Sequence, residues 1–164
     1  MKRVILVRHA KAVPYGYEDD FSRDLRDRGK NDAKLVSTEL QKRNIKPDIM
    51  VASPAKRALK TARIFAENLG VRKKDIIEDK NIYYSPTTHE FVEMINNLPQ
   101  DAETAFFFGH NPGFYYFVNN LLGNFNGDMP TCSTVAIDFD IETWTEVEAR
   151  MGKLAFQIVP KMFK

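Results

Sequence analysis

The sequence contains a single cysteine, Cys132, so no disulfide bond can form within the chain. A lone thiol is typical of a small buried side chain and is compatible with a reducing compartment. No apolar run approaches the roughly 18 residues that span a membrane. The start of the chain has only four apolar residues after Met-Lys-Arg, too few for the apolar region of a signal peptide. We therefore expect a cytoplasmic protein that does not enter a membrane.

An excess of charge of either sign is also missing. Twenty-four lysines and arginines face twenty-two aspartates and glutamates, which leaves a formal net charge of +2. This balance does not provide the positive surface that nucleic acid binding requires. Any anion must therefore be bound by a local group of side chains. The oligomeric state cannot be inferred from the sequence.

The remaining composition is that of one ordinary globular domain, residues 1–164, with 43% hydrophobic residues. Short apolar runs, typical of strands buried on both faces, alternate with segments of helical periodicity. The expected strands are residues 4–7, 49–52, 76–77 and 104–108, and the expected helices are residues 25–46, 54–69, 88–98 and 112–122. This alternation predicts a three-layer α/β/α sandwich with a mainly parallel central sheet.

The last thirty residues have a different pattern. Residues 135–139 alternate apolar with polar side chains, and residues 144–149 and 154–159 form two further strand-like runs. Such alternation is typical of antiparallel strands with one solvated face. The C-terminal segment is therefore predicted to add antiparallel edge strands to the sheet.

Charged and titratable side chains follow the expected strands directly. Arg8 and His9 come after the first strand, His110 comes after the fourth, and Arg57 lies in the first turn of the helix after the second. The carboxyl ends of parallel strands meet at one edge of a sheet, so we expect these side chains to lie together. Guanidinium groups bind phosphate, and imidazole is nucleophilic and titratable near neutral pH. The pattern predicts a phosphate pocket.

The residues beside these side chains support the same prediction. Ser53 and Pro54 are expected to be the N-cap and first residue of the second helix, whose N-terminus favours an anion. Gly109 allows a close approach of the backbone before His110. Asn111 can either cap the following helix or donate a hydrogen bond into the pocket. Thr61 is expected to pack or to bond back to its own helix.

Three segments of the sequence resemble the motifs of a known family. Arg8-His9-Ala10 resembles the Arg-His-Gly signature of the histidine phosphatase superfamily. Ser53-Pro54-x-x-Arg57-Ala58-x-x-Thr61-Ala62 and Gly109-His110-Asn111-Pro112-Gly113 are similar to its second and third motifs. The short chain and its Arg-His-Ala-Lys opening are most similar to the compact SixA-like branch, whose namesakes dephosphorylate phosphohistidine on signalling proteins.

This resemblance implies a phosphatase that needs neither a metal nor a cofactor. His9 would attack phosphorus and become a transient phosphohistidine, which water would then hydrolyse. Arg8, Arg57 and His110 would hold the phosphoryl oxygens and stabilise the charge of the transition state. Arg23, in a stretch similar to one in SixA-like proteins, would also face the phosphate, and we expect Asn111 to contribute to its binding.

The sequence departs from the superfamily at the proton donor. Many members have a glutamate after the third strand, whereas this segment reads Asn81-Ile-Tyr-Tyr84-Ser-Pro. A tyrosine phenol, with an unperturbed pKa of about 10, is a poor donor at neutral pH. The acidic segment Glu18, Asp19 and Asp20 supplies alternative candidates for the acid. Because imidazole leaves more readily than an alkoxide, the missing glutamate favours a phosphohistidine protein as substrate.

Other classes of enzyme fit the sequence less well. A cysteine phosphatase needs an arginine six residues after its nucleophile, but that position relative to Cys132 is Asp138. An aspartate-based phosphatase could be inferred from the Asp-x-Asp at residues 138–140. However, the usual Thr or Val does not follow this motif, and too few residues remain after it to form the rest of such an enzyme. Three histidines spaced 80 and 21 residues apart form no metal motif. A phosphatase of a small phosphomonoester and a non-catalytic phosphate- or phosphopeptide-binding module stay open as alternatives.

Overall fold

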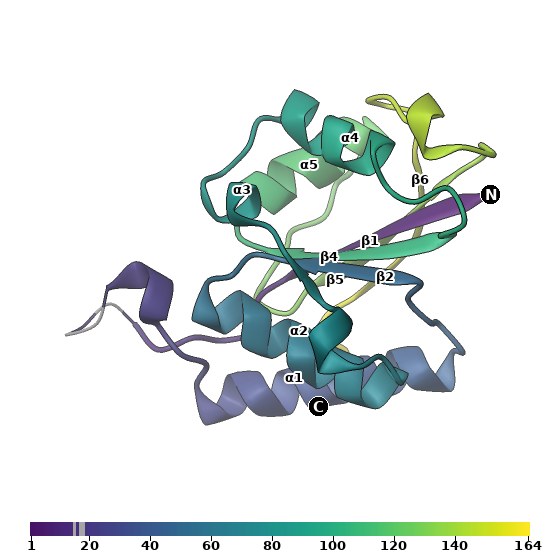
Figure 1. Ribbon diagram of the computed structural model, residues 1–164. Helices are drawn as coiled ribbons and strands as arrows, with labels where there is room; N and C mark the ends of the chain where they lie inside the picture. Colours follow the sequence, from purple (N-terminus) through teal and green to yellow (C-terminus); the bar gives the residue numbers. More distant parts are fainter. Residues whose placement is uncertain (15, 17–18) are drawn as a thin grey trace.

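A computed structural model describes residues 1–14, 16 and 19–164. Its strands form one sheet in the order β3-β2-β4-β1-β5-β6 (Figure 1). The strands are β1 (Lys2–Arg8), β2 (Ile49–Ala52), β3 (Ile77–Glu78), β4 (Thr104–Gly109), β5 (Thr134–Phe139) and β6 (Lys153–Ile158). The pairs β1–β4, β2–β4 and β2–β3 are parallel, and the pairs β1–β5 and β5–β6 are antiparallel. The predicted mainly parallel sheet is confirmed.

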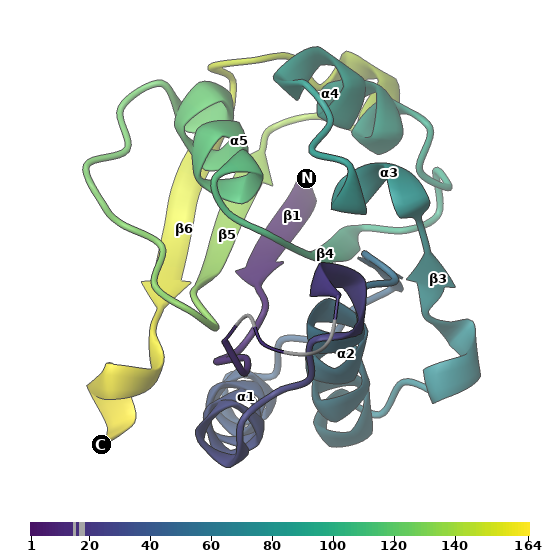
Figure 2. The ribbon, with the colours of Figure 1, turned by 90° about the vertical axis from the view of Figure 1, so that its left-hand side faces the viewer.

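Helices cover both faces of this sheet, which gives the three expected layers (Figure 2). On one face lie α1 (Asp27–Lys42) and α2 (Lys56–Leu69), and on the other lie α4 (Thr88–Asn96) and α5 (Gly113–Leu122). The short helix α3 (Lys80–Tyr83) follows β3 directly. Four 3-10 turns complete the described elements: η1 (Asp20–Ser22), η2 (Lys73–Asp75), η3 (Trp144–Glu146) and η4 (Pro160–Phe163).

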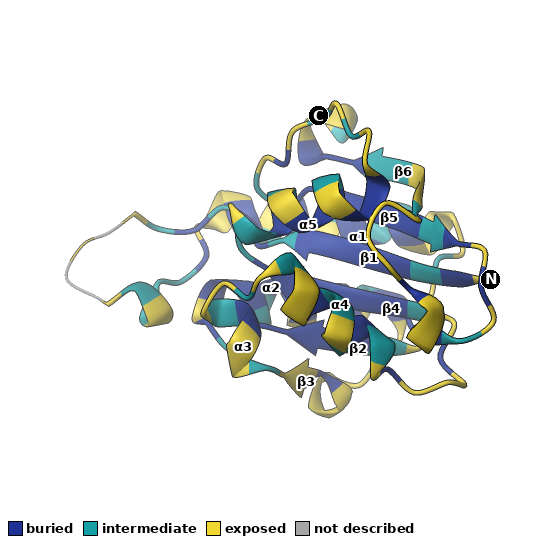
Figure 3. Cartoon of the chain, turned by 90° about the horizontal axis from the view of Figure 1, so that it is seen from above, coloured by how far each residue is buried: buried dark blue, intermediate teal, exposed yellow. Residues whose placement is uncertain are grey.

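The continuous apolar runs of the central strands are explained by burial on both faces. In β1, Val4 and Leu6 contact the cluster that includes α4 and α5, whereas Ile5 and Val7 contact the cluster that includes α1 and α2. The three phenylalanines of β4, residues 106–108, alternate between the same two clusters. Side chains of successive strand residues point to opposite faces, so each helical layer requires its own apolar set. Figure 3 shows the buried strands between helices with exposed outer faces.

Several helix boundaries agree closely with the signals in the sequence, although α1 covers only residues 27–42 of the predicted 25–46. Thr87 and Glu90 form the predicted capping box at the start of α4. Gly70 and Gly123 end α2 and α5 in the left-handed conformation, which glycine adopts without steric cost. Cys132 is a buried free cysteine, as expected. Within the described residues, none of the helices is both long and apolar enough to cross a membrane.

Two local predictions are wrong. Helix α2 begins at Lys56 with Ala55 as its N-cap, because the Ser53 hydroxyl accepts the Ala55 N–H and also contacts His110. Residues 144–146 form the 3-10 turn η3, not a strand. Trp144 is fully buried, and its indole N–H donates to the carbonyls of Pro99 and Ala102. The apolar side chains of this run therefore anchor a loop to the core and do not form a strand.

The C-terminal strands are antiparallel, as predicted, but only β6 lies at the edge of the sheet. Strand β5 is inserted between β1 and β6 and is buried along most of its length. The polar residues of β5 suggested an edge strand with one solvated face, but Thr134 is buried. Asp138 forms an ion pair with Arg3 of the neighbouring strand, with 2.6 Å between Oδ1 and Nε. The register of β5 is fixed by this pairing as well as by apolar contacts.

The end of β4 yields a test of packing. A Cβ atom added to Gly109 would lie 2.5 Å from the Phe114 ring and 2.8 Å from Ile82, so both neighbours would have to move. We expect Gly109→Ala to lower the free energy of unfolding by about 1–3 kcal/mol, measured by urea denaturation. Gly113→Ala is the control, because its Cβ would approach Phe117 only to 3.7 Å. Equal midpoints for the two variants would contradict this account.

Candidate active site

A pocket of about 470 Å³ opens at the carboxyl ends of the parallel strands. This is the edge at which α/β folds bind their ligands. The side chains around it come from segments that are far apart in the sequence. The lining residues are Arg8, His9, Lys11, Ala12, Asp20, Arg23, Arg57, Tyr83, Ser85, His110, Asn111 and Thr131.

The register of the two central strands brings the two histidines together. Arg8 at the end of β1 is the partner of Gly109 at the end of β4. The backbone N–H of His9 donates to the Gly109 carbonyl at 3.0 Å, so the segments that follow β1 and β4 are in contact where they leave the sheet. As a result, the ring centroids of His9 and His110 are 5.4 Å apart.

The imidazole of His9 is held in one tautomer. Its Nδ1 lies 2.8 Å from the carbonyl oxygen of Ala10, which can only accept a hydrogen bond. Nδ1 therefore carries the proton, and Nε2 keeps its lone pair. Burial, reinforced by the charges of Arg57 and Arg8 and opposed by the Ala10 carbonyl, lowers the pKa of His9 to about 4. At neutral pH the ring is thus an uncharged nucleophile or base.

His110 is also uncharged at neutral pH. Burial is the main cause that lowers its pKa to about 3, and the neighbouring His9 and Arg57 lower it further while Asp20 opposes them. Its Nε2 lies 2.8 Å from the Ser53 hydroxyl oxygen. Its Nδ1 is buried and has no hydrogen-bond partner among the described residues. One nitrogen of the ring is therefore anchored, and the other has its hydrogen-bonding capacity unused within the described residues.

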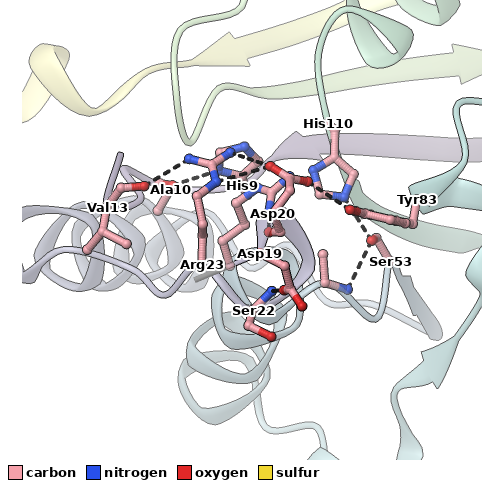
Figure 4. A network of polar contacts seen from close by, with 12 residues as sticks. His9, Ala10, Val13, Asp19, Asp20, Ser22, Arg23, Ser53, Tyr83 and His110 are labelled. Carbon is pink, nitrogen blue, oxygen red and sulfur yellow. Dashed lines mark hydrogen bonds and ion pairs between the residues drawn. The ribbon is translucent and has the colours of Figure 1, made fainter. Parts of the chain in front are cut away.

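Arg57 and Arg23 converge on the carboxylate of Asp20. Figure 4 shows Arg23 and Tyr83 on either side of Asp20. Arg57 donates from Nη1 to the Asp20 carbonyl at 2.6 Å and from Nη2 to Oδ2 at 3.0 Å. Arg23 donates from Nε and Nη2 to Oδ1 at 3.1 and 2.9 Å, and from Nη1 to the Val13 carbonyl at 2.8 Å. The Tyr83 hydroxyl donates to Oδ2 at 2.8 Å. Two guanidinium groups and one phenol thus already bind an oxyanion.

Asp20 is ionised in this arrangement. Burial favours its neutral form, but the hydrogen bonds from Tyr83, Arg57 and Arg23 outweigh burial and hold the pKa of Asp20 well below its usual range. At neutral pH its carboxylate can accept a proton but has none to donate. Of the other acid candidates, Asp19 is exposed and its side chain accepts the backbone N–H of Ser22. Glu18 lies outside the described residues.

Arg8 and Asn111 share one backbone acceptor. Arg8 Nη1 and Asn111 Nδ2 donate to the carbonyl of Met129 at 2.9 and 3.0 Å. The Arg8 Nε and Asn111 Oδ1 atoms are buried and have no partner among the described residues. Of the two roles open to Asn111 in the sequence, the helix cap falls instead to Pro112, and the Asn111 amide lines the pocket.

The sequence analysis did not predict the roles that Ser53, Tyr83 and Thr61 have in the site. Ser53 follows β2 as directly as Arg8 ends β1, so its position could have indicated a contact with His110. Tyr83 lines the pocket, whereas the neighbouring Tyr84 is 75% exposed. Thr61 bonds back to the Arg57 carbonyl, as expected, and also accepts the Ala10 N–H at 3.0 Å. This contact ties α2 to the backbone beside His9.

The site is rich in cations and poor in metal ligands. Arg8, Arg23, Arg57 and Lys11 line the pocket, and Asp20 is the single acidic side chain among its described lining residues. In the described part of the chain, no group of three or more His, Cys, Asp or Glu side chains could hold a metal ion. The arrangement suits an anion that carries more than one negative charge.

Comparison with solved structures shows a shared fold. The protein histidine phosphatase SixA complexed with tungstate has a TM-score of 0.85 at 18% identity, over 99% of both chains. A protein from Agrobacterium tumefaciens described as a candidate SixA phosphohistidine phosphatase has a TM-score of 0.81 at 22% identity, over 97% of this chain and 98% of that one. The ecdysone phosphate phosphatase of Bombix mori has a TM-score of 0.68 at 15% identity, over 95% and 92%.

Comparison of sequences identifies the family. Phosphoserine phosphatase 1 of Hydrogenobacter thermophilus is 39% identical over 107 residues, which are 62% of this chain and 49% of that protein. The chain thus matches about half the length of this curated relative. The histidine phosphatase superfamily (branch 1) matches residues 4–105, more than half of the sequence. The chain therefore belongs to branch 1 of the histidine phosphatase superfamily.

Proposed function

We propose that the protein is a phosphatase that forms a covalent phosphohistidine on His9 and needs no metal. The observation that carries this proposal is the state of His9, a buried neutral imidazole whose Nε2 lone pair is free beside three arginine side chains. A cationic pocket attracts a phosphoryl dianion, and an uncharged imidazole can attack it. Membership of the superfamily and the shared fold with a tungstate-bound SixA support the same function.

Two displacements complete the proposed reaction. In the first, the Nε2 lone pair forms a bond to phosphorus while the bond to the leaving group breaks and its electron pair departs with that group. The phosphorylated ring is then cationic, and its Nδ1–H remains bonded to the Ala10 carbonyl, which stabilises that charge. In the second, water attacks phosphorus, the electron pair of the P–N bond returns to Nε2, and the product leaves as dihydrogen phosphate, which carries both protons of the water.

The remaining polar side chains would stabilise charge on the phosphoryl oxygens. Arg8, Arg23 and Arg57 all line the pocket, and preorganised donors are usually the largest contribution to such catalysis. We assign the Ser53 hydroxyl as donor to Nε2 of His110, because this leaves Nδ1–H of His110 to donate to a phosphoryl oxygen. Asn111 would position Arg8 through their common acceptor, the Met129 carbonyl.

Asp20 would position the arginines instead of acting as an acid. Its ionised carboxylate fixes Arg23 and Arg57, but it cannot protonate a leaving group at neutral pH. A substrate whose leaving group needs little protonation fits this site best, and the imidazole of a phosphohistidine is such a group. We therefore propose a phosphohistidine-containing protein as the substrate.

One observation favours a second candidate function. The curated relative that is 39% identical over 107 residues is a phosphoserine phosphatase. A small phosphomonoester such as phosphoserine is therefore the alternative substrate. Both candidates require a nucleophilic His9, whereas a non-catalytic phosphate-binding module would not.

The nucleophile can be tested by substitution. We expect His9→Ala to lower turnover by more than about a thousandfold and to abolish acid-labile labelling of the enzyme by a radioactive phosphodonor. His89→Ala is the matched control, because the His89 side chain is 83% exposed and does not line the pocket. Both assays are run in EDTA, where full activity of the wild type is expected. Labelling of His9→Ala, or loss of turnover in EDTA, would refute the proposal.

The leaving group can be tested with substrates that differ in one bond. We expect a phosphohistidine protein to be cleaved with a kcat/KM at least about tenfold higher than phosphoserine, because a P–N bond needs less help from an acid. Steady-state kinetics on one enzyme preparation would measure both values. A higher kcat/KM for phosphoserine would favour the phosphomonoester alternative.

The protonation state of the nucleophile predicts a pH dependence. The pKa of His9 is lowered to about 4, so its ring stays neutral as the pH falls through about 6.5, where an ordinary imidazole gains a proton. Side-chain ¹⁵N NMR at about pH 5.5 should show neutral His9 with the proton on Nδ1. A titration midpoint for His9 near 6.5, or a proton on Nε2, would contradict the proposed nucleophile.

A further inference from the structure

We infer that the pocket selects phosphorylated groups whose leaving atom belongs to a flat aromatic ring, through one aromatic side chain that lines it and two that contact this side chain. These are Phe21, Tyr83 and Tyr84, which we call the aromatic rim. The inference rests on the proposed function and assigns a specificity to the same site.

The aromatic rim is assembled from two separate segments of the chain. Phe21 belongs to η1, and Tyr83 and Tyr84 lie at the end of α3. The rings of Phe21 and Tyr83 are 5.2 Å apart and perpendicular, and those of Tyr83 and Tyr84 are also 5.2 Å apart. The hydrogen bond from the Tyr83 hydroxyl to Asp20 joins the two segments and fixes the orientation of the central ring.

A series of ring contacts connects the aromatic rim with His9. Tyr83 lies 5.7 Å from His110, and His110 lies 5.4 Å from His9. Exposure increases outward along this series, from 8% at His9 to 43% at Phe21 and 75% at Tyr84. A path of aromatic faces therefore leads from the buried nucleophile to solvent.

The geometry of phosphoryl transfer determines what occupies this path. The phosphoryl group must lie beside His9 among the arginines, and the attacking and leaving atoms of the displacement are roughly in line. The leaving group thus lies on the side of phosphorus away from the buried His9 ring, towards the open mouth. Aromatic rings in edge or offset contact attract one another beyond simple burial, so an aromatic leaving group gains contacts that an alkyl group lacks.

The exposed surface of the rim supports a role in binding. Single exposed apolar residues are normal on a protein surface. Here two of the large exposed side chains, Phe21 and Tyr84, meet around one ring that lines a charged pocket. Tyr84 is 75% exposed, so most of its surface is open to a substrate.

Four substrates separate the aromatic ring from the type of bond. Phosphohistidine and phosphotyrosine peptides have aromatic leaving groups, through nitrogen and oxygen respectively, and phospholysine and phosphoserine peptides are their aliphatic counterparts. We expect Tyr84→Ala and Phe21→Leu each to lower kcat/KM about fivefold for the aromatic pair and to leave the aliphatic pair unchanged.

Tyr116→Ala is the matched control, since Tyr116 is 56% exposed on α5 and does not line the pocket. It should leave all four values unchanged. Equal losses for aromatic and aliphatic substrates in the rim variants, or no loss in either, would overturn the inference while the wild-type activity upheld the proposed function. Failure of the wild type to cleave any of the four substrates or to be labelled on His9 would overturn both. Circular dichroism and thermal unfolding confirm that each variant is folded before its kinetics are compared.

Discussion

The site depends on the parallel pairing of β1 with β4, in which Arg8 is opposite Gly109. Because of this register, the segments that follow β1 and β4 leave the sheet side by side, and the ring centroids of His9 and His110 are 5.4 Å apart. A shift of one residue would turn the side chains of β1 to the wrong faces and separate the histidines. The apolar residues that fix the register of the two strands therefore also fix the relative position of the two histidines.

Burial then decides the charge of the groups that the strands position. The two histidines are kept neutral because an imidazolium would be desolvated beside arginines, whereas the carboxylate of Asp20 is kept ionised by those same arginines and Tyr83. The same electrostatic environment thus keeps His9 and His110 uncharged and keeps Asp20 ionised. A pocket of this kind is ready for a phosphoryl dianion, since its cations are already fixed before the ligand arrives.

Much of this protein could be predicted from its sequence because the signals are local. Apolar runs and helix caps indicated the α/β layers, and the residues that follow the strands indicated Arg8, His9, Arg57 and His110. The errors have physical causes as well. The apolar run at Trp144 packs a turn against Pro99 and Ala102, and the Ser53 hydroxyl bonds to His110, so the predicted strand and helix start do not form.

The sequence by itself determined the family, the fold class and several of the charged residues that line the pocket, because these follow from motifs and from periodicity along the chain. Only the tertiary structure decided what those residues can do. The tautomer of His9 depends on the direction of one backbone carbonyl. The ionisation of Asp20 and the meeting of Phe21 with Tyr83 depend on burial and on contacts between segments 37 to 63 residues apart. Such contacts are set by the packed chain and leave no periodic signal in the sequence.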